Sequence, residues 1–268
     1  VGNSLLMARF KRSSRFRVLA IALTVALMLG FAANLPARVQ AQLQPDSLSS
    51  KLPNQWEFTA PRGPGNPIPL NRQGGATRSN DCLDIGDSLM ALVPASVGTT
   101  AAEYPTIYWY MPKTSASTVE FMLRDENQQT VYSTKFALAK STKGMVLDTP
   151  RIMSLSLPAF SNLSPLKIGQ EYQWLLVLTC NPLNFSENPF VEGRIKRVEA
   201  DQNLERRISQ ATPQERVALY AETRLWYETV ATLVELQRDR PNSKELKDAM
   251  DKLLTSVGLN TIATQPNI

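Results

Sequence analysis

The sequence predicts an α+β fold in which an antiparallel β-sandwich is followed by a small segment of three helices. Two observations lead to this prediction. Between residues 81 and 198, short alternating or wholly apolar runs follow one another without a helical period, and prolines stand at their ends. After Val198 the apolar residues recur at spacings of three and four, which is the period of a helix that packs on a neighbour.

Composition divides the chain into four parts. We expect a signal peptide over residues 1–41, a disordered linker rich in proline and glycine over 42–80, a β-sandwich domain over 81–198 and a C-terminal helical segment over 199–268.

Residues 1–41 have the order of features that is typical of a secretory signal. Basic residues come first, the apolar run 18–33 follows, and Ala37 and Ala41 are suitable cleavage positions. The apolar run is shorter than the roughly 20 residues that a spanning helix needs. The segment therefore predicts export, with membrane contact only if the segment is not cleaved.

Cleavage also changes the charge balance. Residues 1–41 hold six of the 29 basic residues and none of the 24 acidic ones, so 23 basic and 24 acidic residues follow. Nucleic-acid binding needs a retained basic face. We therefore expect no nucleic-acid partner.

The segment 42–80 carries prolines and glycines among polar residues, with Trp56 and Phe58 as its only aromatics. Such a segment buries too little apolar surface to offset the entropy of ordering it, so we expect extended or disordered backbone. Within it, the tract 71–78 offers glycine amides and two arginines to an anion. Because no strand pattern precedes this tract, a lead-in loop is the favoured interpretation.

Seven short runs between residues 81 and 198 have strand character. We expect strands near residues 83–93, 106–111, 118–124, 130–137, 152–157, 172–180 and 190–197. Leu166, Gly169 and Tyr172 are spaced as in the tyrosine corner of immunoglobulin-like sandwiches, where the hydroxyl bonds to nearby backbone. The fold class is therefore expected to be an immunoglobulin-like sandwich with alternate residues of 172–180 in its core.

Cys82 and Cys180 are the two cysteines of the sequence, and both follow the predicted signal. An even number of cysteines in an oxidising compartment favours a disulfide. Closing a loop of 98 residues stabilises the fold by about 4 to 5 kcal/mol in the chain-entropy model. Two buried free thiols are the alternative.

The C-terminal segment contains three helical patterns. Thr212 and Glu215 form a capping box with proline between them, which predicts a helix start. A second helix is expected over residues 226–238, and a third begins near Asn242 or Ser243 and ends at Gly258. Helices this short bury too little area to be stable alone, so they should dock on the sandwich.

The second and third helices resemble one degenerate tetratricopeptide repeat, with Tyr220, Trp226, Leu233 and Pro241 at matching positions. Tyr220, Trp226 and Leu233 are expected to meet between the first two helices. A single repeat cannot form the concave groove of an array, so a structural cap is expected instead of a peptide-binding site.

Several segments together resemble a cyanobacterial family known as domain of unknown function 928. The matching segments are 71–78 before Cys82, 89–94, 103–106, 110–112, 172–174 with Cys180, 190–193 with Arg197, and 211–227. The resemblance implies an exported β-sandwich followed by helices, in a bacterium with a periplasm and thylakoids. It implies no established activity and transfers no catalytic residue, and Arg224 stands where similar chains have a small residue.

The sequence contains no histidine, which excludes catalytic triads, histidine zinc sites and histidine acid–base chemistry from it. The pair Ser164 and Lys167 has lactamase-like spacing but lacks the companion motifs. No catalytic residue, metal or cofactor is therefore expected.

Carboxylates are the remaining candidates for chemistry. Asn80, Asp81, Asp84 and Asp87 offer oxygen ligands for calcium, but their spacing is not that of an EF-hand, so a polar lead-in is favoured. A sugar hydrolase needs a pair of carboxylates. The candidates for such a pair are Glu103, Asp125, Glu171 and Glu192.

Tyr104, Tyr108 and Tyr110 form a candidate interaction surface along one predicted strand. Exposed aromatics on a sandwich stack on sugar rings or anchor a protein partner. The alternative is ordinary packing, because the helices need an apolar surface to lie on.

These observations favour an exported, envelope-associated protein without catalytic activity, acting as a protein-interaction or structural module. A carbohydrate-binding module and a carboxylate-based hydrolase are the alternatives. The expected partner is an envelope protein or a glycan, and the expected compartment is the periplasm, the thylakoid lumen or the extracellular space.

Overall fold

The structure, a computed structural model, describes residues 52–53, 55–58, 70–75, 82–84, 86–138, 149–159 and 163–263. The predicted signal peptide and its cleavage positions lie outside the described residues.

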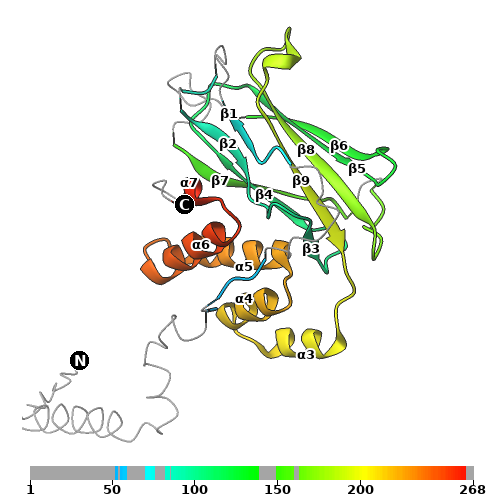
Figure 1. Ribbon diagram of the computed structural model, residues 1–268, viewed down its shortest axis with the longest axis vertical. Coiled ribbons are helices and arrows are strands. Elements are labelled where there is room, and N and C mark those ends of the chain that lie inside the picture. The colour runs from blue at the N-terminus through cyan, green and yellow to red at the C-terminus, as the bar shows by residue number, and fades with distance from the viewer. Residues whose placement is uncertain are drawn as a thin grey trace, which may run out of the picture. The chain divides into compact units, whose positions relative to one another are not determined.

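Two β-sheets form the larger part of the described fold (Figure 1). The first sheet has the strand order β1 (Gln73–Gly75), β2 (Ser88–Ala91), β4 (Thr106–Met111) and β7 (Arg151–Ser156). The second sheet has the order β3 (Gly98–Thr100), β9 (Phe190–Arg197), β8 (Glu171–Thr179), β5 (Thr118–Arg124) and β6 (Thr130–Ala137). The helices gather at one end of the two sheets in Figure 1.

Alternation of apolar and polar residues builds the core between the sheets. Phe121 of β5 stacks on Trp174 of β8 with ring centroids 6.1 Å apart. Trp109 of the first sheet reaches Phe136 of the second at 6.5 Å. The expected inward face of β8 is confirmed, since Tyr172, Trp174, Leu176 and Leu178 are all buried.

The mixed α+β class is confirmed, with two differences in the sheets. Strand β3 pairs with β9 in parallel, so the second sheet is not purely antiparallel. The first expected strand, near 83–93, shortens to β2, and Leu83 forms only an isolated bridge to Thr114. Tyr172 makes the expected corner contact, because its hydroxyl accepts a hydrogen bond from Lys167 N–H at 3.1 Å. The immunoglobulin-like and tetratricopeptide-like assignments stay predictions.

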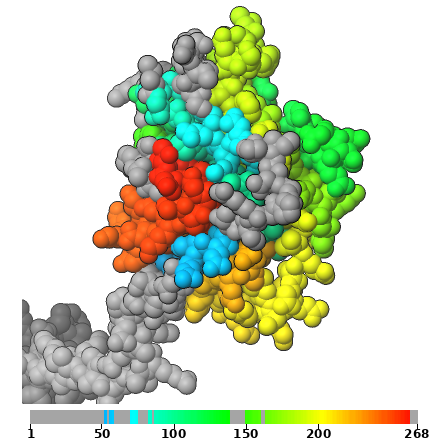
Figure 2. Space-filling model, viewed as in Figure 1, coloured from blue at the N-terminus to red at the C-terminus, as the bar shows by residue number. Residues whose placement is uncertain are grey.

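The described residues of the expected linker belong to the fold, which corrects that expectation for them. Phe58 is buried and packs edge-on against Trp226 at 4.9 Å. Arg72 donates hydrogen bonds to the carbonyls of Val93, at 3.1 Å, and Val257, at 2.8 Å. Figure 2 shows the blue segment before residue 60 against the orange helices and the cyan segment 70–75 beside the red C-terminal helices. Long-range contacts thus order a segment whose composition is that of a linker.

Close backbone approach explains the glycine at position 74. A Cβ there would lie 2.5 Å from the carbonyl oxygen of Phe190. The neighbouring Asn71 accepts a bond from Glu192 N–H at 2.8 Å and donates one to Phe190 O at 2.9 Å. The described part of this tract, residues 71–75, therefore joins the first sheet to β9 of the second, in keeping with the expected lead-in role.

Five α-helices complete the described fold. They are α3 (Gln202–Gln210), α4 (Pro213–Glu222), α5 (Trp226–Asp239), α6 (Lys244–Ser256) and α7 (Asn260–Ala263). The capping box of Thr212 and Glu215 and the cap at Ser243 are confirmed. The helices α3 and α7 were not expected, because their patterns are short. A 3-10 turn, η2 (Phe185–Glu187), lies between β8 and β9.

Arg224, at the turn between α4 and α5, has a positive φ of 60°. This left-handed conformation places the side chain close to the following carbonyl and favours glycine or asparagine. The expectation of a small residue at this turn thus has a backbone reason.

Two adjacent aromatic residues at the start of α5 attach the helices to both sheets. Trp226 donates its indole N–H to Leu92 O, after β2, at 2.9 Å. The Tyr227 hydroxyl accepts from Trp174 Nε1 at 3.2 Å and donates to Arg194 O of β9 at 3.1 Å. Gly98 makes room for this contact, since a Cβ there would lie 2.9 Å from the Tyr227 ring.

Trp226 therefore docks on the sheets, as the predicted docking of the helices requires, and its contact with Tyr220 and Leu233 stays a prediction. Glu228 adds to the attachment, because its Oε1 accepts from Thr100 Oγ1 at 2.6 Å and from Ala101 N–H at 2.8 Å. Burial raises the pKa of Tyr227 well above its ordinary value. Its hydroxyl therefore stays a protonated donor.

Replacing Trp226 with alanine should destabilise the whole fold. The side chain is 1% exposed, so its loss leaves a cavity that costs about 3 to 5 kcal/mol. We expect one cooperative unfolding transition for sandwich and helices together, shifted to lower denaturant concentration in the variant. A separate helical transition, or an unchanged midpoint, would show that the helices form an independent module.

The Tyr227→Phe change tests the bridging hydroxyl alone. It leaves the buried Trp174 N–H and Arg194 carbonyl without their partner, which should lower the free energy of unfolding by about 1 to 3 kcal/mol. Tyr132→Phe is the matched control, because Tyr132 is only half-buried on the edge strand β6. Equal losses in the two variants, measured by chemical denaturation, would contradict the bridge.

Cys82 and Cys180 form the predicted disulfide, with their Cα atoms 5.4 Å apart. The bond joins the segment before β2 to the residue that follows β8. It therefore links the two sheets covalently.

Reduction should lower the free energy of unfolding by up to about 4 to 5 kcal/mol, because the reduced unfolded chain regains the entropy of an open loop. Alkylation followed by mass spectrometry should find both thiols masked before reduction. A Cys82→Ser/Cys180→Ser variant is the control and should not respond to reductant. Identical melting of the oxidised and reduced natural chain would argue against the prediction.

Candidate functional site

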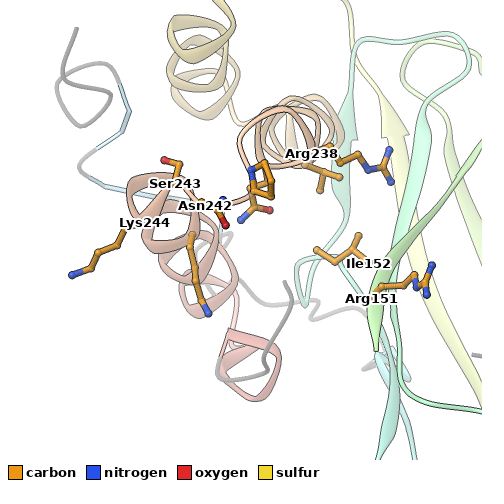
Figure 3. Close-up of a pocket in the computed structure, with 10 residues that line it drawn as sticks. Arg151, Ile152, Arg238, Asn242, Ser243 and Lys244 are labelled. Atoms are coloured by element: carbon orange, nitrogen blue, oxygen red, sulfur yellow. The ribbon is translucent and has the colours of Figure 1, made fainter. Parts of the chain in front are cut away.

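A cleft of about 670 Å³ lies between the edge strand β7 and the helices α5 and α6. Its lining residues are Arg151, Ile152, Val234, Gln237, Arg238, Pro241, Asn242, Ser243, Lys244 and Lys247. Figure 3 shows Arg238 reaching from its helix toward the strand that carries Arg151 and Ile152. Helix α5 contacts β3 and β4. The cleft lies beyond β4, beside the edge strand β7.

Four cations and no carboxylate are among the residues that line the cleft. In the described part of the chain, none of Arg151, Arg238, Lys244 and Lys247 forms a salt bridge. Lys244 lies on the outer rim and points away from β7 in Figure 3. The site therefore carries positive charge that the described carboxylates do not neutralise by direct contact.

Acidic groups on α5 and α6 lie near this charge without lining the cleft, among them Glu235, Glu245 and Asp251. Burial raises the pKa of Asp251, while Lys247 lowers it and Asp248 raises it. The influence of Asp251 reaches Lys247 along the helix, and Asp251 itself does not line the cleft.

The floor of the cleft is apolar. Val234 is buried and Ile152 is half-buried, and Pro241 adds an apolar ring at the turn between the helices. Next to this floor, burial and Glu235 raise the pKa of Tyr108 to about 12. An apolar floor with a cationic rim suits a ligand that has both apolar and anionic groups.

The structure does not place the three tyrosines on an exposed surface, which corrects that expectation. Tyr108 and Tyr110 are 4% and 3% exposed. Tyr104 is half-buried and donates its hydroxyl to Leu163 O at 3.3 Å. Ordinary packing, the alternative interpretation, explains the burial of Tyr108 and Tyr110. Strand β4 lies under α5 on one face and faces the second sheet on the other.

Three of the four acidic candidates for a hydrolase pair have structural contacts. Glu103 pairs with Arg197 at 3.3 Å, and Glu192 accepts from Gln173 Nε2 at 3.0 Å. Asp125 accepts two backbone bonds at 2.9 Å within the β5–β6 turn. Glu171 is exposed at the start of β8.

The suggested calcium ligands are only partly described. Asp84 pairs with Lys113 at 3.5 Å, whereas Asn80 and Asp81 lie outside the described residues. Among the described residues, no group of three or more aspartate, glutamate or cysteine side chains is placed to hold a metal ion.

The hairpin tip between β8 and β9 exposes apolar side chains that the sequence did not single out. Leu183 is 94% exposed and Phe185 is 68% exposed. The loop is held by the buried Asn188, whose Oδ1 accepts from Cys180 N–H at 2.9 Å and Asn181 N–H at 3.0 Å. These hydrogen bonds hold the conformation of the tip, and its asparagines serve to form the turn.

The cleft was also missed by the sequence analysis. Lys244 and Lys247 lie one helical turn apart, which is a common surface pattern. Arg151 comes from a strand far earlier in the chain, and only the packing of α5 on β4 brings it near Arg238. Asp148 stands three residues before Arg151, so the local sequence gives no sign of a cationic site, and the pattern becomes specific only in three dimensions.

Fold and cleft define a two-sheet α+β domain with a helical cover and a cationic cleft. Within the described segments, no helix has the length and apolar character needed to cross a bilayer. The chain belongs to the family described as Domain of Unknown Function (DUF928), whose model matches residues 73–267. No curated protein matches the chain.

Family membership confirms the resemblance drawn from the sequence and is consistent with an activity that is not known. Cyanobacterial origin stays a prediction. The disulfide is compatible with the expected export to an oxidising compartment.

Proposed function

We propose that the chain is an exported, envelope-associated binding protein without catalytic activity, and that a partner protein binds in the cationic cleft. One observation carries the proposal, which is that Arg151, Arg238 and Lys247 line an apolar floor without a salt bridge to a described carboxylate, with Lys244 on the outer rim.

Electrostatics supports an anionic ligand. Like charges around one cleft repel each other, and an anion that enters the cleft relieves this repulsion. Arginine also offers a planar fork of donors that matches a carboxylate. The two arginines therefore give the site geometric selectivity as well as charge.

Rigidity supports a binding role. The wall formed by α5 is fixed by Trp226, Tyr227 and Glu228 on the sheets. A preorganised wall loses little conformational entropy when a partner binds, so more of the interaction energy appears as affinity.

The non-catalytic role is supported by the sequence and by the acidic side chains. The sequence has no histidine for acid–base chemistry. Glu103, Asp125 and Glu192 hold structural contacts, as described above. The expected export adds that the partner belongs to the cell envelope.

Reversing the charge of the two arginines tests the proposal. We expect Arg151→Glu/Arg238→Glu to weaken binding of poly-L-glutamate by at least about tenfold, because attraction becomes repulsion. Binding to the natural protein should also weaken at high salt. The control is Lys252→Glu, which reverses an exposed charge on α6 that does not line the cleft.

Capture of envelope proteins on the tagged protein extends the test, with a glycan array beside it. The proposal expects a partner that is captured by the natural protein and by Lys252→Glu but lost from the double variant. Reproducible glycan binding without a protein partner would replace the proposal with a carbohydrate-binding module. Equal binding by all variants would remove the cleft from the function.

A further inference from the structure

Strand β7 offers open backbone groups beside the cleft. It lies at the edge of the first sheet, and β4 is its one strand partner among the described residues. Leu157 N–H donates to Pro105 O at 3.1 Å, so every second residue of β7 counted from Leu157 bonds to β4, and the residues between them point away from β4. By this alternation, Ile152, Ser154 and Ser156 direct their N–H and C=O groups to the open edge.

The same residues also face the helices. Ile152 and Ser154 lie opposite Tyr110 and Tyr108 of β4, so they share a face with these two tyrosines. The charges of Glu235 and Arg238 on α5 act on the Tyr108 hydroxyl, so this face is the one toward α5. Ile152 lines the cleft. A strand added to this edge would therefore direct alternate side chains toward the cleft.

We propose that β7 and the cleft bind an extended acidic segment of a protein partner by strand addition. The backbone of that segment bonds to Ile152, Ser154 and Ser156, and its alternate carboxylates face Arg238 and Lys247. The inference rests on the proposed function, because the cationic cleft provides the attraction for an anion. Charge selects acidic side chains, and the row of alternating donors and acceptors selects a polypeptide over a polysaccharide.

The strand has few of the features by which proteins block an open edge. It spans six residues, contains no proline and pairs with β4 without a shift in register. Its single charged residue is Arg151, which is among the residues that line the cleft and takes the opposite face of the strand from Ile152.

Three probes distinguish strand addition from attraction by charge alone. The first is a ten-residue synthetic peptide that alternates glutamate and valine. The second is the same peptide with N-methyl groups on alternate residues, in two versions that cover both phases, and the third is polygalacturonate. We expect the first to bind and one N-methyl version to bind about tenfold more weakly, because it loses donors to β7.

A proline on β7 provides the matched protein variant. Ser154→Pro removes an N–H that points to the open edge and leaves the ladder with β4 intact. The control is Ser133→Pro on β6, the edge strand of the second sheet. There Leu138 N–H donates to Ser117 O. By the same alternation, the N–H and C=O groups of Ser133 point to the open edge of β6. Only Ser154→Pro should weaken peptide binding by about tenfold, and Ser154→Ala should bind normally.

Hydrogen exchange gives a readout that does not depend on the proline variant folding. The peptide should slow exchange of the amides of Ile152, Ser154 and Ser156 in the natural protein. Strand addition is overturned if these amides are unaffected, or if both N-methyl versions and polygalacturonate bind as tightly as the peptide. In that case the anion-binding cleft still stands, whereas failure of every anionic probe to bind refutes the proposed function as well.

Discussion

The seating of Trp226 and Tyr227 on the two sheets is the contact on which the remaining arrangement depends. Trp226 bonds to the end of β2 and Tyr227 bridges β8 and β9, so the first turn of α5 is tied to both sheets at once. Glycine at position 98 permits the approach, and at position 193 a Cβ would come within 2.3 Å of the Trp174 ring. Because the indole N–H groups of Trp226 and Trp174 and the Tyr227 hydroxyl all have partners, their burial with the apolar rings costs little desolvation energy.

This contact determines what the rest of the surface looks like. Once α5 lies on β4, the tyrosines of that strand are buried and are no longer accessible to a ligand. The strand β7 stays at the edge, and the cationic residues of α5 and α6 are brought opposite it. The proposed interaction surface is therefore a charged cleft, one strand away from the aromatic strand that the sequence suggested.

The sequence was sufficient where a local pattern determines the structure. The alternation in β5 and β8, the capping box at Thr212 and the cap at Ser243 were found because each depends on neighbouring residues. Strands β1 and β3 have three residues each and contain glycine, so their pairing with distant strands decides their conformation. The cleft could not be predicted for the same reason, since Arg151 and Arg238 meet only through the path of α5 over β4.

The contacts of Phe58 and Arg72 have a consequence for the order in which the molecule can assemble. Phe58 packs on Trp226, and Arg72 bonds to the carbonyl of Val257, a separation of 185 residues. During synthesis Phe58 lacks its aromatic partner until Trp226 has been made, and the bond from Arg72 to Val257 waits for the end of α6, although Arg72 also bonds to the nearby Val93. Contacts of such long range close late and slowly, because the intervening loop must first lose its entropy. The core is therefore completed only when nearly the whole chain is available, and such late closure is compatible with the export that we propose for this chain.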